Sequence, residues 1–233
     1  MLAAGVAVGA SGGGPNGVAA GTAQIDPPPD PAQFSRTVDN PLFPASTLRF
    51  KSMRGTERDS ESGRLVRVRV ETRVLRRTHR VAGVPVLVVQ DRDFEDGELV
   101  ERTFDYFAED RQGNVWYFGE DVDDLEDGRV VGHEGQWLAG RRGAKPGLFM
   151  PAAPAVGQTF EQEQAPGVAE DRSTILAVGI RMRTRAGTFR GCIKTRDFAP
   201  LDRLAETKYY CPRVGLARQL DRRGGKVEVA RFG

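Results

Sequence analysis

The chain of 233 residues is poor in the residues that build metal and redox centres, with two histidines and two cysteines. A typical zinc site needs three or four nitrogen, sulfur or carboxylate ligands, and His79 and His133 lie in different surroundings. No apolar run approaches the roughly 20 residues of a membrane-spanning helix. No basic run is interleaved with aromatic residues, which leaves nucleic-acid binding without support. We therefore expect no metal centre, no membrane span and no nucleic-acid partner, and the sequence identifies no cofactor.

The densest acidic stretch, residues 121–128 (DVDDLEDG), has the carboxylate content of a calcium loop without its spacing. The EF-hand pattern requires glycine at the sixth position and glutamate at the twelfth, and neither is present. We interpret the stretch as a solvated hairpin turn.

Alternation of apolar and charged residues is the main pattern that the chain does contain. Residues 64–74 (RLVRVRVETRV) place Val66, Val68 and Val70 on one face and arginines on the other. A repeat of two is typical of a half-buried strand, and the glycine turns between such runs are typical of hairpins. The sequence therefore predicts an all-β fold, an antiparallel up-and-down meander of about a dozen strands curled into a barrel or half-barrel. The expected strands span residues 47–54, 64–76, 84–94, 98–108, 114–121, 129–139, 158–164, 173–183, 188–198, 205–211, 216–221 and 226–232.

The composition divides the chain into an N-terminal extension, residues 1–40, and a single β-barrel-like domain, residues 41–233. The extension begins with small residues and ends in a proline-rich spacer, residues 27–31 (PPPDP). It is either a disordered tail or the remnant of a secretory signal.

The expected strand that contains residues 84–89 (VPVLVV) is apolar on both faces, so another segment must cover its outer side. The N-terminal segment and the connection formed by residues 140–157 are the two candidates. That connection shows no strand pattern and contains an apolar plug, Leu148, Phe149 and Met150. Such a loop is either a lid over the mouth of the barrel or a cap over one end, and we favour the cap.

The two cysteines are placed to form a local disulfide. If Phe198 pairs with Ala205 across the intervening turn, the hairpin register brings Cys192 directly opposite Cys211. Directly opposed residues of an antiparallel pair come close enough to be bridged. Such a bond would imply an oxidising compartment.

Charge is unevenly distributed along the chain, although the net charge is only +2. Residues 91–134 hold sixteen acidic residues against four arginines, whereas residues 172–233 hold fifteen basic against five acidic residues. In a meander these two segments form neighbouring or opposing walls, so we expect them to neutralise one another.

Aromatic residues concentrate in three consecutive expected strands and suggest a ligand-binding wall. Strict alternation places Trp116, Phe118 and Glu120 on one face; if that face points inward, the ligand should bear a hydroxyl group or a positive charge. The alternative face holds Val115 and Tyr117. The candidate ligand-binding residues are Trp116, Phe118, Glu120, Trp137, Phe104 and Tyr106. An ordinary filled barrel core accounts for the same aromatics equally well.

Catalytic candidates are few. Glu163 and Glu170 flank a turn, where facing carboxyl groups can divide acid and base roles. His133 is the only plausible general base by residue type. The competing interpretation is that these are solvent-exposed charges at hairpin flanks.

Several stretches together resemble a family of secreted bacterial β-rich proteins of uncharacterised function. They are residues 113–121 (GNVWYFGED), 145–147 (KPG), 150–152 (MPA), 166–171 (PGVAED), 187–189 (GTF), 208–210 (KYY) and 214–216 (VGL). The resemblance covers roughly residues 40–232 and implies a shape similar to the half-barrels of lipoprotein-carrier proteins. The chain departs from it at Cys211, Pro212 and Arg213, where the family pattern has Ala-Pro-Gly.

These observations favour a secreted or periplasmic protein that binds an apolar or amphipathic small molecule. The first alternative is an enzyme, a hydrolase, lyase or cyclase, that uses the candidate carboxyl groups and histidine inside the barrel. The second is a structural or partner-binding envelope protein with a filled core. The sequence leaves the oligomeric state open.

Overall fold

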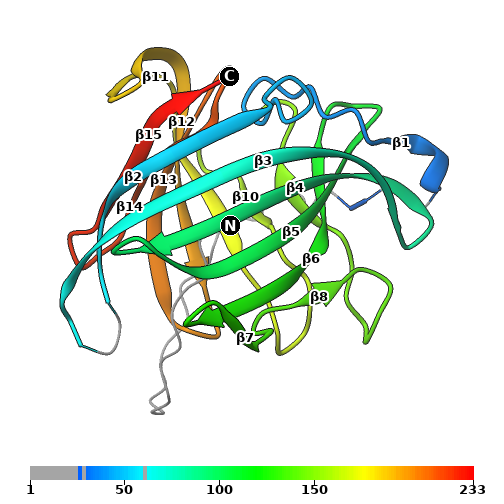
Figure 1. Ribbon diagram of the computed structural model, residues 1–233. Helices are drawn as coiled ribbons and strands as arrows, with labels where there is room; N and C mark the ends of the chain where they lie inside the picture. Colours follow the sequence, from blue (N-terminus) through cyan, green and yellow to red (C-terminus); the bar gives the residue numbers. More distant parts are fainter. Residues whose placement is uncertain (1–25, 28–29, 60–61) are drawn as a thin grey trace, which may run out of the picture.

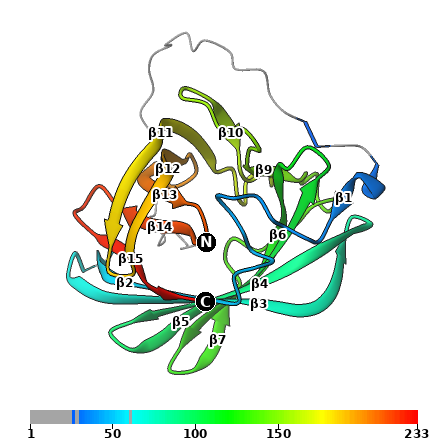
Figure 2. The same cartoon turned by 90° about the horizontal axis from the view of Figure 1, so that it is seen from above.

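The computed structural model describes residues 26–27, 30–59 and 62–233, and these fold into one curled antiparallel sheet (Figure 1; Figure 2 shows it from above). The predicted fold class is confirmed. Within the described part of the chain, no helix is long and apolar enough to cross a membrane. The elements are η1 (Pro31–Gln33), β1 (Phe34–Ser35), β2 (Phe50–Arg58), β3 (Leu65–Val81), β4 (Val84–Glu95), β5 (Glu98–Asp110), β6 (Val115–Glu126), β7 (Arg129–Gly132), β8 (Trp137–Leu138), β9 (Gly147–Met150), β10 (Thr159–Glu161), β11 (Arg172–Thr184), β12 (Gly187–Ala199), β13 (Leu204–Cys211), β14 (Gly215–Leu220) and β15 (Lys226–Phe232).

The sheet follows the order β10 to β15, then β2 to β7. Nearly every strand pairs with its neighbour in sequence, because the short hairpin turns leave no other partner within reach. Along this path the exception is the pairing of β15 with β2, in which Val229 lies opposite Met53. This pairing places the first long strand and the last strand together in the middle of the sheet. Off the path, β1 pairs with β5, and β8 and β9 pair with β6.

The two ends of the sheet approach each other without forming a continuous ladder. A single bridge joins Lys145 to Gln164, with the Lys145 amide donating to the Gln164 carbonyl over 3.0 Å. Gly147 permits this approach, because a Cβ atom there would lie 2.0 Å from the carbonyl oxygen of Gln162. The sheet is therefore not closed by a continuous ladder, which fits a barrel or a half-barrel. We refer to this incompletely closed sheet as the half-barrel, and its seam lies between β9 and β10.

Two expected segments differ from the structure. The strand predicted over residues 129–139 is split into β7 and β8, because the chain turns at Gly135, which has a φ of +76°. The connection 140–157, expected to contain no strand, includes β9, which pairs with β6. The sequence of β9 shows no alternation of apolar and polar residues, because both faces of this short strand are buried.

The N-terminal segment covers the outer face of the sheet at β4 to β6. β1 pairs with β5, and the ring of Phe34 packs edge-on against Phe118 with centroids 5.3 Å apart. Val38 is fully buried, and the amide of Asn40 donates to the Glu109 carboxylate over 2.8 Å. Residues 31–40 therefore pack as part of the folded domain, although the sequence places them in the extension; residues 1–25 lie outside the described residues.

Aromatic rings fill the inner side of the same strands. Phe149 of β9 lies 5.0 Å from Phe107 and 6.2 Å from Tyr210, measured between ring centroids. Phe107 in turn stacks on Tyr117 at 4.8 Å. The expected apolar plug thus lies inside the half-barrel, where it closes one part of the interior.

The predicted disulfide is present. Phe198 pairs with Ala205, as the hairpin register requires, and Cys192 is bonded to Cys211 with a Cα–Cα distance of 4.2 Å. Both cysteines are fully buried. The bond joins the middle of β12 to the last residue of β13.

We predict that breaking this bond lowers the free energy of unfolding by about 3 kcal/mol, since a cross-link restricts the unfolded chain. The Cys192→Ser/Cys211→Ser variant, compared with the oxidised protein by urea unfolding, measures this difference. Thiol labelling of the denatured, unreduced protein should find no free thiol, and two labelled cysteines would contradict the assignment.

We also predict that Phe34→Ala destabilises the protein by about 3 kcal/mol, because the side chain fills the outer cover over Phe118. Leu65→Ala is the matched control, since Leu65 is 52% exposed and its loss should change stability by less than about 0.5 kcal/mol. Equal effects of the two substitutions would show that the N-terminal segment does not contribute to folding.

Candidate functional site

The concave face of the sheet holds a cavity of about 480 Å³. We call it the carboxylate cavity, because twelve of its lining residues are acidic and only Lys208 is basic. Exposed Glu134 and Leu201 lie at its mouth, near the loops that follow β7 and β12. The acidic residues are Glu57, Asp93, Glu95, Glu101, Glu120, Asp124, Glu134, Glu163, Asp171, Asp197, Asp202 and Glu206.

The register of β4, β5 and β6 builds one wall of the cavity. Asp93 lies directly opposite Glu101, and Glu101 lies directly opposite Asp124. Further along, Asp105 lies opposite Glu120. Directly opposed side chains have Cβ atoms about 5 Å apart, where like charges repel. Two rows of carboxyl groups thus face the interior. Lys51 of β2 is buried beside them and interacts with Asp91 and Asp105.

A β-bulge in β6 brings Glu120 into this wall. Phe107 pairs with Tyr117 and Asp105 pairs with Glu120. Between these two pairs lie one residue of β5 and two residues of β6. The extra residue lies near Gly119, which has a φ of +116° and where a Cβ atom would lie 2.2 Å from the Trp137 carbonyl oxygen. Glu120 therefore shares a face with Tyr117, and the prediction that it shares one with Trp116 and Phe118 is wrong.

A polar network around Lys208 forms the opposite wall. The Lys208 Nζ lies 3.3 Å from Asp197 Oδ2 and 3.4 Å from Glu206 Oε2. The Ser173 hydroxyl donates to Asp197 Oδ1 over 2.6 Å, and the Gln219 amide donates to Glu206 Oε1 over 3.0 Å. One ammonium group thus balances two of the carboxylates on this wall.

Burial shifts the titration of the carboxyl groups on the β4–β6 wall. It raises the pKa of Glu101 to about 7, with a further contribution from Asp124. Burial and the charge of Asp105 raise the pKa of Glu120 to about 8. Burial, reinforced by Glu101, raises the pKa of Asp93 well above its usual range. These groups keep their protons to a higher pH than exposed carboxyl groups do, because desolvation and mutual repulsion both disfavour the charged form.

The other wall shows the same effect. Burial raises the pKa of Glu57 to about 7, and the neighbouring Glu206 adds to the shift. Burial and Glu120 raise the pKa of Glu163 well above its usual range. For Lys208, burial lowers the pKa but the adjacent Asp197 and Glu206 outweigh it, so its pKa lies well above the usual value and the side chain stays charged.

A smaller apolar pocket of about 70 Å³ lies next to the carboxylate cavity, since Lys208 lines both. Its polar side also holds Lys51, Thr72, Asp91 and Asp105. Asp105 accepts a hydrogen bond from the Tyr117 hydroxyl over 2.6 Å. Its apolar lining consists of Phe43, Pro44, Ala45, Leu48, Val74, Val89, Phe107, Phe149, Val214 and Leu216. The interior therefore combines an acidic chamber with an adjoining apolar pocket.

Most of the predicted aromatic ligand-binding residues lie on the outer face of the sheet. The Trp116 Nε1 donates to Asp110 Oδ2 over 2.8 Å, and Phe118 packs on the N-terminal segment. Tyr106 stacks on His79, and the guanidinium of Arg77 lies over Phe104. All four belong to the outer packing rather than to the cavity lining.

Of the six predicted ligand-binding residues, Glu120 lines the cavity. Trp137 does not line it but is the cross-strand neighbour of Glu120. Trp137 is opposite Glu120 in the register, and its ring packs edge-on against Tyr117 at 5.5 Å. Its Nε1 is buried and has no hydrogen-bond partner among the described residues. Trp137 is therefore placed to report on the cavity by its fluorescence.

The three catalytic candidates are not brought together. Glu163 lines the cavity, but Glu170 accepts a hydrogen bond from the Gly167 amide in an exposed turn. His133 is exposed, and its Nδ1 lies 2.6 Å from the Val122 carbonyl oxygen. Among the residues that the structure describes, no group of three or more histidine, cysteine, aspartate or glutamate side chains could hold a metal ion.

Several cavity residues were not among the sequence candidates, notably Asp93, Glu101, Asp124 and the Lys208 network. The sequence feature that points to these residues is the excess of acidic over basic residues in the segment 91–134. The expectation that basic residues of the C-terminal third neutralise this excess is not met, because only Lys208 lines the cavity. Hairpin register alone would have placed Asp93 opposite Val100, because the pairing of Asp93 with Glu101 depends on a register shift next to Phe94.

No family model, curated protein or solved structure matches the chain. The resemblance to a secreted family therefore stays a prediction, and the function is argued from the cavity alone.

We predict that the protein becomes less stable as the pH rises from 5 to 8.5. Glutamate in an unfolded chain titrates near pH 4.3, whereas in the fold the pKa of Glu57 and of Glu101 is about 7 and that of Glu120 about 8. Over this range the folded state binds more protons than the unfolded state, so the free energy of unfolding falls with rising pH. Thermal unfolding at each pH measures the effect.

The variants Glu101→Gln and Glu120→Gln should flatten this pH dependence, because they remove groups that lose protons in the folded state. Glu161→Gln is the matched control, since Glu161 is exposed on β10. A melting temperature that rises from pH 5 to 8.5 in the unsubstituted protein would contradict the assignment.

Proposed function

We propose that this protein binds a small amphipathic molecule that carries positive charge, in a secreted or periplasmic setting. The observation that carries the proposal is the carboxylate cavity, with its twelve acidic residues and single lysine. Its volume of about 480 Å³ falls within the range of small-molecule sites, roughly 300–1,000 Å³.

The charge of the ligand follows from the electrostatics of the empty cavity. Carboxyl groups that face one another across strands repel when ionised, and buried ones retain protons instead. Asp93 is 6% exposed, lines the cavity, and its Oδ1 has no hydrogen-bond partner among the described residues. A bound cation would supply the missing partner and allow Asp93 and Glu101 to ionise.

The amphipathic character follows from the rest of the lining. Val68, Phe94, Val100, Val122 and Phe198 line the cavity between the carboxyl groups. The adjoining apolar pocket ends at aromatic side chains. An ammonium group among the carboxylates, with a hydrocarbon or aromatic portion directed at this pocket, uses both surfaces.

The proposed compartment rests on the buried Cys192–Cys211 disulfide. Such bonds persist in oxidising environments such as the bacterial periplasm and the extracellular space.

The enzyme hypothesis has less support, because of its three residues only Glu163 lines the cavity. The position of Glu163 suits binding as well as acid chemistry. A binding site therefore explains more of the arrangement with fewer assumptions.

We predict that at pH 8 the protein binds dodecylamine at least tenfold more tightly than dodecanol or dodecanoate. Isothermal titration calorimetry in two buffers of different ionisation enthalpy measures affinity and proton release together. Because the pKa of Glu120 is raised to about 8, this group is only partly ionised at pH 8, and binding of the amine should release protons from it. The change in Trp137 fluorescence gives a second reading of occupancy.

Two variants test the site itself. Asp93→Asn/Glu120→Gln should weaken amine binding by at least tenfold, since a charged hydrogen-bonded pair contributes roughly 1.5–3 kcal/mol. Glu161→Gln/Asp127→Asn makes the same change in charge at exposed positions and should leave binding unaltered. Tighter binding of dodecanoate, or no binding of any of the three compounds, would overturn the proposal.

A further inference from the structure

The β11–β12 hairpin carries a concentration of exposed arginines on the end of the fold away from the cavity mouth. Arg181, Arg183, Arg185 and Arg190 are all exposed. Three of them line a shallow groove together with Thr184, Gly187 and Thr188. β12 runs from the tip of this hairpin, at one end of the molecule, to the loop at the cavity mouth, at the other end (Figure 1).

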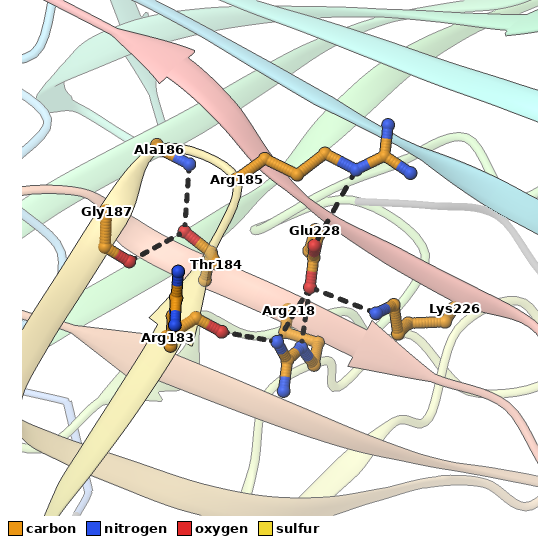
Figure 3. A network of polar contacts seen from close by, with 8 residues as sticks. All are labelled: Arg183, Thr184, Arg185, Ala186, Gly187, Arg218, Lys226 and Glu228. Atoms are coloured by element: carbon orange, nitrogen blue, oxygen red, sulfur yellow. Dashed lines mark hydrogen bonds and ion pairs between the residues drawn. The ribbon is translucent and has the colours of Figure 1, made fainter.

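The tip of the hairpin is held rigidly against β14 and β15 (Figure 3). The Arg218 guanidinium donates to the Arg183 carbonyl over 2.6 Å, and the Ala186 amide donates to the Val229 carbonyl over 3.2 Å. The disulfide fixes β12 a few residues beyond the tip. The arginines therefore project from a preorganised hairpin.

The local positive charge is only partly balanced. Glu228 lies 2.7 Å from Arg218, 3.4 Å from Lys226 and 3.6 Å from Arg185 (Figure 3). This single carboxylate thus forms ion pairs with three basic side chains. Arg181 and Arg183 form no ion pair with any residue that the structure describes.

Exposed apolar side chains continue along the same edge of the sheet. Leu176 and Val178 of β11 are 41% and 44% exposed. Val156 is 62% exposed and lies beside them, because the Gly157 amide donates to the Ile175 carbonyl over 2.9 Å. Arginines next to exposed aliphatic side chains match an anionic lipid surface, which offers phosphate groups above an apolar layer.

The concentration of twelve carboxyl groups in the cavity reinforces this match. Without the thirteen charged residues of the cavity lining, the chain has 33 basic residues against 20 acidic ones. The exterior is therefore strongly positive, and the acidic mouth lies at the other end of β12 from the hairpin. An anionic surface would attract the hairpin end and repel the mouth.

We propose that the β11–β12 hairpin, with Arg181, Arg183, Leu176 and Val178, docks the protein on an anionic phospholipid surface. Docking in this orientation leaves the cavity mouth facing away from the lipid. The proposal is independent of the ligand in the cavity.

The test is flotation of the purified protein with lipid vesicles. We expect binding to vesicles of phosphatidylcholine with 30% phosphatidylglycerol, chosen as roughly a physiological anionic fraction, little binding to phosphatidylcholine alone, and a loss of binding at high salt. Arg181→Gln/Arg183→Gln should reduce the vesicle partition coefficient about thirtyfold, since each arginine near an anionic surface contributes roughly 1 kcal/mol. Leu176→Ser/Val178→Ser should also reduce it, because the aliphatic side chains enter the interface.

The matched control is Arg111→Gln/Arg129→Gln, which removes two exposed arginines elsewhere. It should retain most of the binding. Circular dichroism and thermal unfolding identify any variant that fails to fold, and the two pairs of hairpin variants provide independent readings.

Three outcomes would overturn the proposal. The first is no binding to the anionic vesicles, and the second is an equal loss of binding in the control variant. The third is binding of inorganic phosphate that competes fully with the vesicles and is unaffected by Leu176→Ser/Val178→Ser, which would indicate a site for a free anion instead of a lipid surface.

Discussion

Repulsion among carboxyl groups on the concave face of the sheet is the constraint on which the rest of this structure depends. Asp93, Glu101 and Asp124 occupy one row across three strands, and Asp105 and Glu120 occupy another. A sheet that curls inward brings such rows toward the acidic wall around Asp197 and Glu206. The fold tolerates this only while the groups hold protons or face a cation, because ionised carboxylates are costly to bury unpaired.

The apolar part of the fold offsets that cost. β4, β5 and β6 are packed on both faces, by the Phe149 cluster inside and by Phe34 and Val38 outside. The disulfide ties β12 to β13 on the other side of the half-barrel. Because these features hold the curvature in place, the acidic chamber keeps its shape without salt bridges across its β4–β6 wall. The apolar clusters of the sheet thus provide its stability, whereas the carboxyl groups of its concave face form the proposed binding site.

Separation of charge between the inside and the outside connects the two proposals. A net charge of +2 conceals an acidic interior and a basic exterior. The interior suits a cationic ligand, whereas the exterior, and above all the β11–β12 hairpin, suits an anionic surface. Opposite ends of β12 carry these two properties, so docking at one end leaves the other accessible. A protein that takes up or delivers an amphipathic cation near a membrane would use both.

The sequence by itself determined the all-β meander, most of the strands and the disulfide. Strand alternation and hairpin turns are local, so the runs around Val66 and Val70 and the pairing of Phe198 with Ala205 follow from neighbouring residues alone. Only the tertiary structure decided the binding face. The bulge at Gly119 reverses the alternation between Phe118 and Glu120, and a single extra residue leaves no mark in the apolar pattern. The tertiary structure also decided that β15 pairs with β2 and that residues 31–40 pack over Phe118. These contacts join segments far apart in the chain, and no local preference of either segment specifies its partner.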